Sequence, residues 1–410
     1  MDEGNDCRFG EGFEVDLQVQ GVRLLRRLQP LLARLHDAGC ARDKAGNRRL
    51  HYNELCSLIL LTFFNPTIKT LRDLNVASRL KTVRRRLGCS HASLGSISES
   101  LHLFDPEMLG EIFRELLGQV RLSPHADERL KQLAHVPTAV DGTLLAHLPR
   151  IAQAAVSRPQ KPAWKLHAQF EILRGVPTFA RVTDARGRGP AGEKAVLRHS
   201  LEADRCYVCD RGYEEFSLFN AIVAAKSSYV CRVRNDHHFA SEEVREIPPE
   251  AAAAGVLEDT LGRMGSPKSK RIEHPDHLQR RVVLRAEEHP KRGGRRRQAT
   301  LHDIVLVTNL LDVPVEWIGL LYRYRWLIEL FFRWLKCVLS CRHLLSKGAN
   351  GIQIQMYCAL IACLLIQISC PIKPNRQTYV AISLYLQGWA NEEELLDLIQ
   401  REVARAKKTN

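Results

Sequence analysis

The sequence LYRYRWLIELFFRWLKCVLS, which covers residues 321–340, shows the clearest amphipathic pattern in the chain. On a helix that turns by about 100° per residue, its polar side chains fall within an arc of roughly 80°. The polar arc consists of Tyr322, Arg325, Glu329, Arg333 and Lys336. The opposite side is apolar and consists of Leu327, Leu330, Phe331, Trp334, Leu335 and Val338. The pattern predicts a helix that buries one face and presents the other.

The polar face of this predicted helix places one carboxylate in a row of cations. Ion pairs between Glu329 and the arginines four residues away on each side would contribute only about 0.2–0.5 kcal/mol each. Such pairs account for Arg325 and Arg333, but not for Tyr322 and Lys336 further along the same face. A carboxylate that binds a metal ion, flanked by cations that bind phosphate groups, accounts for all five residues.

Charge and composition narrow the class of protein. The 410 residues include 60 lysines and arginines against 46 acidic residues, a net charge of +14 that favours a polyanionic partner, nucleic acid first. Hydrophobic residues make up 45% of the chain, as in a folded protein with a large core. Residues 1–20 are acidic and do not resemble a secretory signal, and the apolar run 356–366 is too short to span a bilayer. We therefore expect a cytoplasmic protein with no membrane partner.

The hydrophobic pattern changes twice along the chain. Apolar residues recur at three- and four-residue spacing in 22–38, 52–64 and 108–120, which predicts helices. Short apolar runs then predict strands at 138–143, 165–173, 176–184, 206–210, 228–234 and 304–308. Between the last two, the chain is polar, with β-rich runs at 244–247 and 281–286 and the basic stretch KRGGRRR at 291–297. Further helices are expected at 352–368, which is almost wholly apolar, and at 392–407.

Two aspartates occupy similar places, each at the end of a predicted strand and shortly before a glycine. These are Asp141, before Gly142, and Asp210, before Gly212. An acid after a strand is, taken alone, most often a turn or helix cap. Open α/β sheets place their sites at the carboxyl ends of strands, where both aspartates could meet Glu329. Three carboxylates in one cleft need cations to neutralise them, and Mg²⁺ prefers such oxygen ligands.

Two other polar groups were considered. Lys165 and His167 share one face of the predicted strand 165–173, between the two aspartates in the sequence. We interpret them as structural polar residues, with a contact to DNA as the alternative. The basic stretch 291–297 is either a solvated loop or a non-specific phosphate contact.

These residues resemble the motifs of the DDE transposases of the insertion-sequence-4 type. The spacing Tyr322-x2-Arg325-x3-Glu329-x6-Lys336 matches the Y-x2-R-x3-E-x6-K signature of that family's third catalytic region. VDGT at 140–143 is similar to its first acidic motif, and DRGY at 210–213, with YVCRVR at 229–234, is similar to its second. The stretch 95–106 resembles its N-terminal domain, so the resemblance covers roughly residues 55–370.

The resemblance implies an α/β fold: a ribonuclease-H-like core with a β-rich insertion and an all-α N-terminal domain. It implies that Asp141, Asp210 and Glu329 are the catalytic residues and the metal ligands, holding Mg²⁺ or Mn²⁺ and, as we expect, two ions. It implies that Tyr322, Arg325 and Lys336 contact DNA phosphates, and Arg333 shares their face. The partner would be double-stranded DNA, as transposon ends and as target, bound by a homodimer on paired ends at the bacterial nucleoid.

The expected organisation has five segments. They are a helical N-terminal DNA-binding or support domain, 1–125; the first part of the catalytic core, 126–234; the β-rich insertion, 235–300; the second part of the core, 301–375; and a C-terminal helix with a basic tail, 376–410.

The implied function is cut-and-paste transposition, in which the enzyme cleaves the transposon ends and transfers the freed 3′-hydroxyl to target DNA. Two alternatives stay open. One is a catalytically inactive DNA-binding protein derived from a transposase, and the other is a metal-dependent endonuclease that cuts without strand transfer.

Overall fold

The computed structural model describes most of the chain. The described residues are 22–38, 46, 48–65, 67–123, 126–145, 164–185, 189–265, 274–286, 302–337, 339, 341, 343–369, 376–386 and 388–408. The N-terminal residues 1–20 and the basic stretch 291–297 lie outside them.

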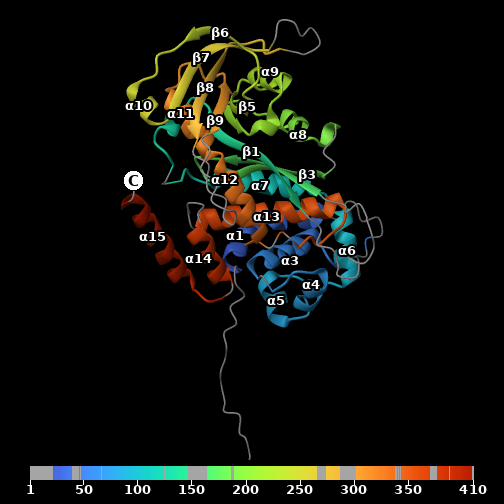
Figure 1. The fold of residues 1–410 in the computed structure, drawn as a ribbon. Coiled ribbons are helices and arrows are strands. Elements are labelled where there is room, and N and C mark those ends of the chain that lie inside the picture. The colour runs from blue at the N-terminus through green and yellow to red at the C-terminus, as the bar shows by residue number, and fades with distance from the viewer. Residues whose placement is uncertain are drawn as a thin grey trace, which may run out of the picture.

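One mixed sheet forms the centre of the molecule (Figure 1). Its strands are β1 (Val136–Leu145), β2 (Trp164–Glu171), β3 (Val176–Asp184), β4 (Arg205–Cys209), β5 (Ser228–Val233), β6 (Phe239–Val244), β7 (Val256–Met264), β8 (Gln279–Ala286) and β9 (His302–Thr308). Within the described residues they lie in the order β3-β2-β1-β4-β5-β9-β8-β7-β6. β1, β4 and β5 are parallel to one another, and every other neighbouring pair is antiparallel.

The six strands predicted from apolar runs are confirmed as β1 to β5 and β9. The polar region was predicted less well: 281–286 falls within β8, but 244–247 overlaps β6 only at Val244, and β7 was missed. The missed strands lie at the far end of the sheet, where β6 is exposed along most of its length. A strand that is exposed on both faces has no apolar alternation by which to recognise it.

Helices cover both faces of the sheet. α8 (Glu193–His199) and α9 (Phe216–Ala224) cover one face, and α11 (Val315–Tyr324), α12 (Trp326–Cys337) and α13 (Ala349–Ser369) cover the other. β4 shows how one strand serves both layers, because Tyr207 and Cys209 belong to the α8–α9 core while Cys206 and Val208 belong to the other. This alternation is the two-residue period of a strand buried on both sides.

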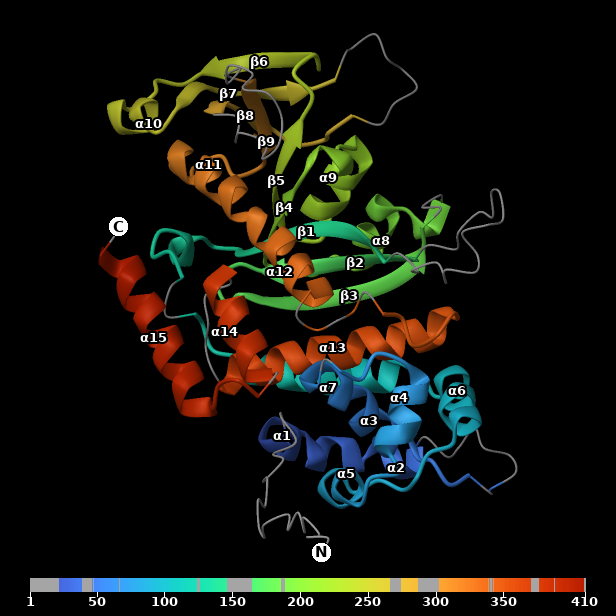
Figure 2. The same ribbon diagram turned by 60° about the horizontal axis from the view of Figure 1, so that its bottom comes forward.

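The N-terminal helices pack around α13 on the side away from the sheet (Figure 2). They are α1 (Val22–Ala33), α2 (Leu35–Ala38), α3 (Tyr52–Phe64), α4 (Leu71–Ala77), α5 (Lys81–Leu87), α6 (Leu94–Leu103) and α7 (Glu107–Gln119). α13 contacts α7 and α3 on one side and β3 on the other. By length and composition α13 could span a membrane, but 89% of its apolar window is buried inside the protein. The prediction of a buried helix at 352–368 is confirmed.

Three further helices complete the described structure: α10 (Pro249–Ala253), between β6 and β7, and the C-terminal pair α14 (Arg376–Leu386) and α15 (Glu392–Lys408), which pack on each other. The predicted helix at 392–407 is confirmed as α15.

The prediction of one continuous helix over 321–340 is wrong. α11 ends at Tyr324 and α12 begins at Trp326, so the helix is interrupted at Arg325. Arg325 N donates to Tyr322 O and Ile328 N donates to Arg325 O, both over 3.2 Å. These bonds span three residues, and such a 3₁₀ step advances about 120° per residue instead of about 100°. The extra rotation turns the start of α12.

That rotation changes which apolar residues are buried. Phe331, Trp334 and Leu335 are buried as predicted, whereas Leu327 and Leu330 are only half-buried. Ile328 and Phe332 are buried as well. Val338 lies outside the described residues.

Candidate active site

The register of two parallel strands brings the two aspartates together. Val140 of β1 pairs with Cys209 of β4, so the next residues, Asp141 and Asp210, are neighbours across the sheet. β4 ends at Cys209, whereas β1 continues to Leu145 paired only with β2. Beyond the two acids one flank of β1 is therefore open. Sequence spacing alone could not show this, because the register pairs residues that are 69 positions apart, such as Val140 and Cys209.

Backbone groups orient both carboxylates. Gly142 N donates to Asp141 Oδ1 over 2.7 Å, and Arg211 N donates to Asp210 Oδ1 over 2.6 Å. Asp141 also projects to the same side of β1 as Ala139, because side chains alternate along a strand. Ala139 belongs to the core beneath α12, so Asp141 faces the helix that carries Glu329.

Arg325 joins the third acid to the other two. Its Nη2 lies 2.7 Å from Glu329 Oε1, and its side chain is 14% exposed against 33% for Glu329. The charge of Arg325 also acts on Asp141 and on Asp210. The interruption at Arg325 thus lies where one guanidinium pairs with Glu329 and its charge acts on the other two carboxylates. The cation and the acid are four residues apart, so this part of the prediction needed only local geometry.

The carboxyl group of Asp141 is electrostatically perturbed. Burial is the main cause that raises its pKa, to about 6, and the charges of Glu193 and Glu329 raise it further. The Gly142 hydrogen bond and Arg325 act in the opposite sense but do not restore the usual value. A buried acid next to other acids is the setting in which a bound cation would be favoured.

The donor chemistry of the three acids fits a divalent metal ion, although they are not grouped around one point. Among the described residues, no three His, Cys, Asp or Glu side chains lie close enough together to hold an ion. Glu329 is engaged by Arg325, and Asp210 by Arg211 N and by the Tyr322 hydroxyl. Three carboxylates, one of them buried with a raised pKa, still form the oxygen-rich set that Mg²⁺ prefers.

The predicted DNA-contacting residues lie at different distances from these acids. The Tyr322 hydroxyl donates to Asp210 Oδ1 over 3.4 Å, and the Arg325 guanidinium lies 5.6 Å from the Tyr322 ring centroid. Lys336 Nζ donates to Thr143 Oγ1 over 2.5 Å, so Lys336 contacts the same strand as Asp141. Arg333 is exposed. Tyr322 and Lys336 therefore contact residues at the ends of β4 and β1 from the helix side.

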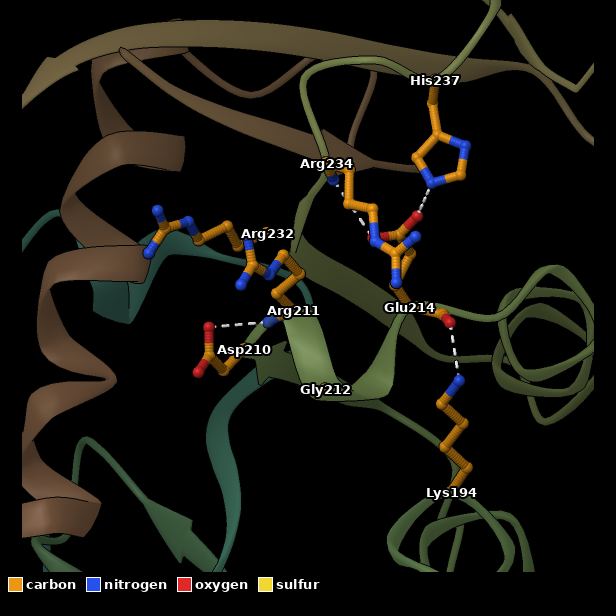
Figure 3. Close-up of a pocket in the computed structure, with 8 residues that line it drawn as sticks. All are labelled: Lys194, Asp210, Arg211, Gly212, Glu214, Arg232, Arg234 and His237. Carbon is orange, nitrogen blue, oxygen red and sulfur yellow. Dashed lines mark hydrogen bonds and ion pairs between the residues drawn. The ribbon is translucent and has the colours of Figure 1, made fainter. Parts of the chain in front are cut away.

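A basic pocket opens beside Asp210, and sequence analysis missed it (Figure 3). Its volume is about 600 Å³, and it is lined by Lys194, Asp210, Arg211, Gly212, Glu214, Arg232, Arg234 and His237. Glu214 organises one wall, because it accepts hydrogen bonds from Arg234 N and forms an ion pair with His237, while its carbonyl accepts from Lys194 Nζ. The alternating arginines of YVCRVR at the end of a buried strand were the available signal.

Lys165 and His167 have separate structural partners. Lys165 Nζ lies 2.6 Å from a Glu193 carboxylate oxygen. His167 is 3% exposed and shares a hydrogen bond of 2.8 Å between its Nε2 and Thr183 Oγ1. Burial lowers the pKa of His167 to about 4, so its ring is neutral at pH 7. The contact and the burial of His167 support the structural interpretation of that residue.

Comparison with known proteins identifies the family to which this acid-rich strand edge beneath a basic helix face belongs. Residues 133–365 match the family described as the transposase DDE domain. This match covers more than half of the chain, and the chain belongs to that family.

Individual relatives are transposases of bacterial elements. The chain is 28% identical over 206 residues to a putative transposase, y4zB, of Sinorhizobium fredii, covering 50% of this chain and 53% of that one. It is 25% identical over 220 residues to a probable transposase for insertion sequence element IS5377 of Geobacillus stearothermophilus, covering 53% and 52%. The chain thus spans about half the length of these curated relatives.

Among solved structures, the piggyBac transposase synaptic complex with hairpin DNA, determined by cryo-EM, is a distant neighbour. Its sequence identity to this chain is 11% and the TM-score is 0.38, over 90% of this chain and 82% of that one.

Proposed function

We propose that this chain is an active DNA transposase that cleaves transposon ends and transfers the resulting 3′-hydroxyl to target DNA. One observation carries the proposal: the pairing of Val140 with Cys209 sets Asp141 beside Asp210, under the helix that bears Glu329. Family membership supports the class of reaction. The cut-and-paste sequence of steps is our inference from the intact acids and the signature around them.

In this proposal Asp141, Asp210 and Glu329 hold Mg²⁺, or Mn²⁺, with two ions expected. Such ions, when bound, activate the attacking oxygen and stabilise the leaving oxygen of a phosphoryl transfer. Strand register fixes the backbone positions of Asp141 and Asp210 relative to each other. In the free protein Glu329 Oε1 accepts from Arg325 Nη2, and a metal ion bound at that oxygen would exchange with the guanidinium.

That exchange gives Arg325 its role. Its Nε is buried and has no hydrogen-bond partner among the described residues. A buried donor without a partner is costly, and a planar guanidinium can hold a phosphate with two parallel hydrogen bonds. A DNA phosphate arriving at the site would satisfy Arg325 and release Glu329 together. Tyr322, Arg333 and Lys336 then line the path of the same strand.

The strand arrangement supports a ribonuclease-H-like core. Five strands follow the order β3-β2-β1-β4-β5, in which β1, β2 and β3 are antiparallel neighbours and β4 and β5 run parallel to β1. The remaining strands extend the same sheet on the far side of β9 and correspond to the proposed β-rich insertion. A match to the transposase of element IS4SA of Synechocystis, 35% identical over 95 residues, supports the insertion-sequence-4 type. It covers 22% of this chain and 28% of that one.

The proposed partner is double-stranded DNA, bound by a homodimer on paired ends in the bacterial cytoplasm. The helical domain 1–125 would add a second contact, because α5 presents Lys81 and Arg85 on its exposed side. α5 ends at Gly88, whose φ of 64° is the left-handed conformation of a helix C-cap.

The test is a strand-transfer assay with precut ends of the parent element. Wild-type protein with Mg²⁺ should produce joined product, and Glu329→Gln should not, while it binds the ends with nearly unchanged affinity. Glu316→Gln, a carboxylate on the neighbouring helix α11, is the matched control and should join normally.

Two results would replace the proposal. Nicked DNA without joined product would identify an endonuclease. Tight end binding with neither product, in both wild type and Glu329→Gln, would identify a DNA-binding protein without catalysis.

A further inference from the structure

A fourth carboxylate lies beside the two aspartates, and no part of the signature includes it. Glu193 is the first residue of α8, on the face of the sheet opposite to α12. A Cβ atom placed on Gly142 would lie 2.7 Å from Glu193 Oε1 and 2.9 Å from Lys165 Cε. The Cβ side of Gly142, on the face of β1 opposite to the Asp141 side chain, is therefore filled by the ends of these two side chains, and glycine at 142 leaves room for them.

The open flank of β1 explains how Glu193 reaches this position. Beyond Val140, β1 pairs with β2 but no longer with β4. A side chain from the α8 layer can therefore approach the acids past the end of β4. The charge of Glu193 acts on Asp141, and as a cause of the raised pKa of that group it comes before the charge of Glu329.

Lys165 is the counter-ion of Glu193. Its Nζ lies 2.6 Å from Glu193 Oε1, and the two side chains are 21% and 26% exposed. Lys165 lies on β2 opposite Leu144, three residues beyond Asp141. The Lys165 side chain is thus partly exposed, so a DNA phosphate could compete with Glu193 for its ammonium group.

A buried donor without a partner points to the same place. The Tyr213 side chain is 2% exposed, and its hydroxyl has no hydrogen-bond partner among the described residues. Burial raises the pKa of Tyr213, and the nearest acidic influences are Glu193, Asp141 and Asp210. The hydroxyl is therefore a protonated donor on which the charge of Glu193 acts, and a buried donor without a partner is costly. The ion pair between Lys165 and Glu193 does not by itself explain why the Tyr213 hydroxyl is buried there without a partner.

Building on the proposed function, we propose that Glu193 is a fourth carboxylate of the metal site. In the free protein Lys165 holds it. When Lys165 moves to a DNA phosphate, Glu193 turns past Gly142 and joins Asp141 in holding the divalent ion, directly or through a water molecule. The Tyr213 hydroxyl donates to the turned carboxylate and fixes its orientation.

The experiment measures Mn²⁺ affinity of the full chain bound to a short duplex DNA, from the electron paramagnetic resonance signal of free Mn²⁺, with the same duplex alone as the blank. Glu193→Gln keeps the size of the side chain and a hydrogen bond to Lys165, and it should weaken Mn²⁺ binding about tenfold. Glu215→Gln is the matched control, because Glu215 pairs with Lys194 and Arg198 and is similarly exposed, and it should bind as wild type does. Circular dichroism verifies that each variant is folded.

Lys165→Met provides the opposite test. It removes the counter-ion while keeping the aliphatic chain, so in the protein without DNA Glu193 is released and Mn²⁺ should bind about threefold more tightly or better than to wild type without DNA. Equal affinities of Glu193→Gln and wild type, or a loss of affinity in Lys165→Met, would overturn the inference.

Glu329→Gln separates this inference from the proposed function. If Glu329→Gln weakens Mn²⁺ binding and Glu193→Gln does not, the three-acid site stands and Glu193 is outside it. If Glu329→Gln leaves the wild-type affinity unchanged, the proposed metal site itself is wrong, and the role of Glu193 is wrong with it.

Discussion

The edge of β1 and β4 and the helical pair α11–α12 supply the same chemistry under different structural control. The two aspartates project from paired strands, so the hydrogen bonds of the sheet hold their backbones in place. Glu329 projects from a helix interrupted one turn earlier and is paired with a mobile type of side chain, an arginine. The comparison indicates that one site has a rigid half, formed by Asp141 and Asp210, and an adjustable half, formed by Glu329. The ion pair with Arg325 determines when Glu329 is available to a metal ion.

The largest expected effect is on the rate of end cleavage, when a proposed metal ligand is removed from either half of the site. Asp141→Asn, Asp210→Asn and Glu329→Gln should each lower the rate of end cleavage in Mg²⁺ about a thousand-fold or more, because groups that act as one unit are lost together. Single-turnover cleavage of end DNA measures the rate. If only the strand variants lost activity, Glu329 would not be a ligand and the comparison between the two halves would fail.

The next largest effect is expected on folding stability, at a buried ion pair that supports the loop before α11. Arg280 of β8 and Asp259 of β7 form an ion pair of 2.6 Å with side chains 4% and 3% exposed. Arg280 also donates to the carbonyls of Leu311 and Val313, just before α11 begins. Arg280→Leu leaves Asp259 buried without its partner and should lower the free energy of unfolding by about 3–5 kcal/mol. Urea denaturation followed by circular dichroism measures it.

Arg281→Ala is the control for that prediction, because the Arg281–Glu258 pair is more exposed, at 26% and 35%. Its expected cost is less than about 1 kcal/mol. Equal effects of the two variants would mean that Arg280 does not support the loop before α11.

A smaller effect on folding stability is expected from the ionisation of Asp141. The pKa of Asp141 is raised to about 6 in the folded protein, against about 3.9 for an unperturbed aspartate. Between pH 4 and 6 the folded state therefore binds the proton more tightly than the unfolded state does, so stability falls as pH rises through this window and levels off above it. Asp141→Asn should remove that fall and raise the metal-free stability at pH 7 by on the order of 2 kcal/mol.

Thermal unfolding at pH 4.5 and pH 7, with a chelator present, measures this difference. Bound metal should reverse the pH dependence of stability. Wild type with Mn²⁺ should gain stability at pH 7 and lose that gain below pH 6, because protons compete for the carboxylate. If Asp141→Asn were no more stable than wild type at pH 7, the surroundings of Asp141 would not disfavour its ionised form.

The smallest effect tests the far end of the helix. Lys336→Ala removes one cation that now contacts Thr143 and should reduce the dependence of log affinity on log salt by about one. Filter binding to duplex DNA over a salt series measures the slope, with Lys131→Ala, whose ammonium pairs with Glu128, as control. An unchanged slope would assign Lys336 to the contact between α12 and β1 alone.

Local patterns predicted much of this structure. The apolar runs located β1 to β5 and β9 because strands buried on both faces must be apolar. The helical periodicity located α3, α7, α13 and α15 for the corresponding reason. Predictions failed where a strand is exposed on both faces, as at β6, where a buried strand carries polar residues such as Asp259 and Thr260, as at β7, and at the 3₁₀ step at Arg325. The hydrophobic period carries no information about any of these.

The sequence by itself determined which residues could form the site, since the spacing of Tyr322, Arg325, Glu329 and Lys336 needs only one helical face. Only the tertiary structure decided that Asp141 and Asp210 are neighbours, that Arg325 lies among the acids, and that Glu193 and Arg232 join them from elsewhere in the fold. The physical reason is that strand register and the end of β4 are set by pairing between distant segments. A local pattern records the periodicity of an element, whereas the partner of that element follows from the packing of the whole chain.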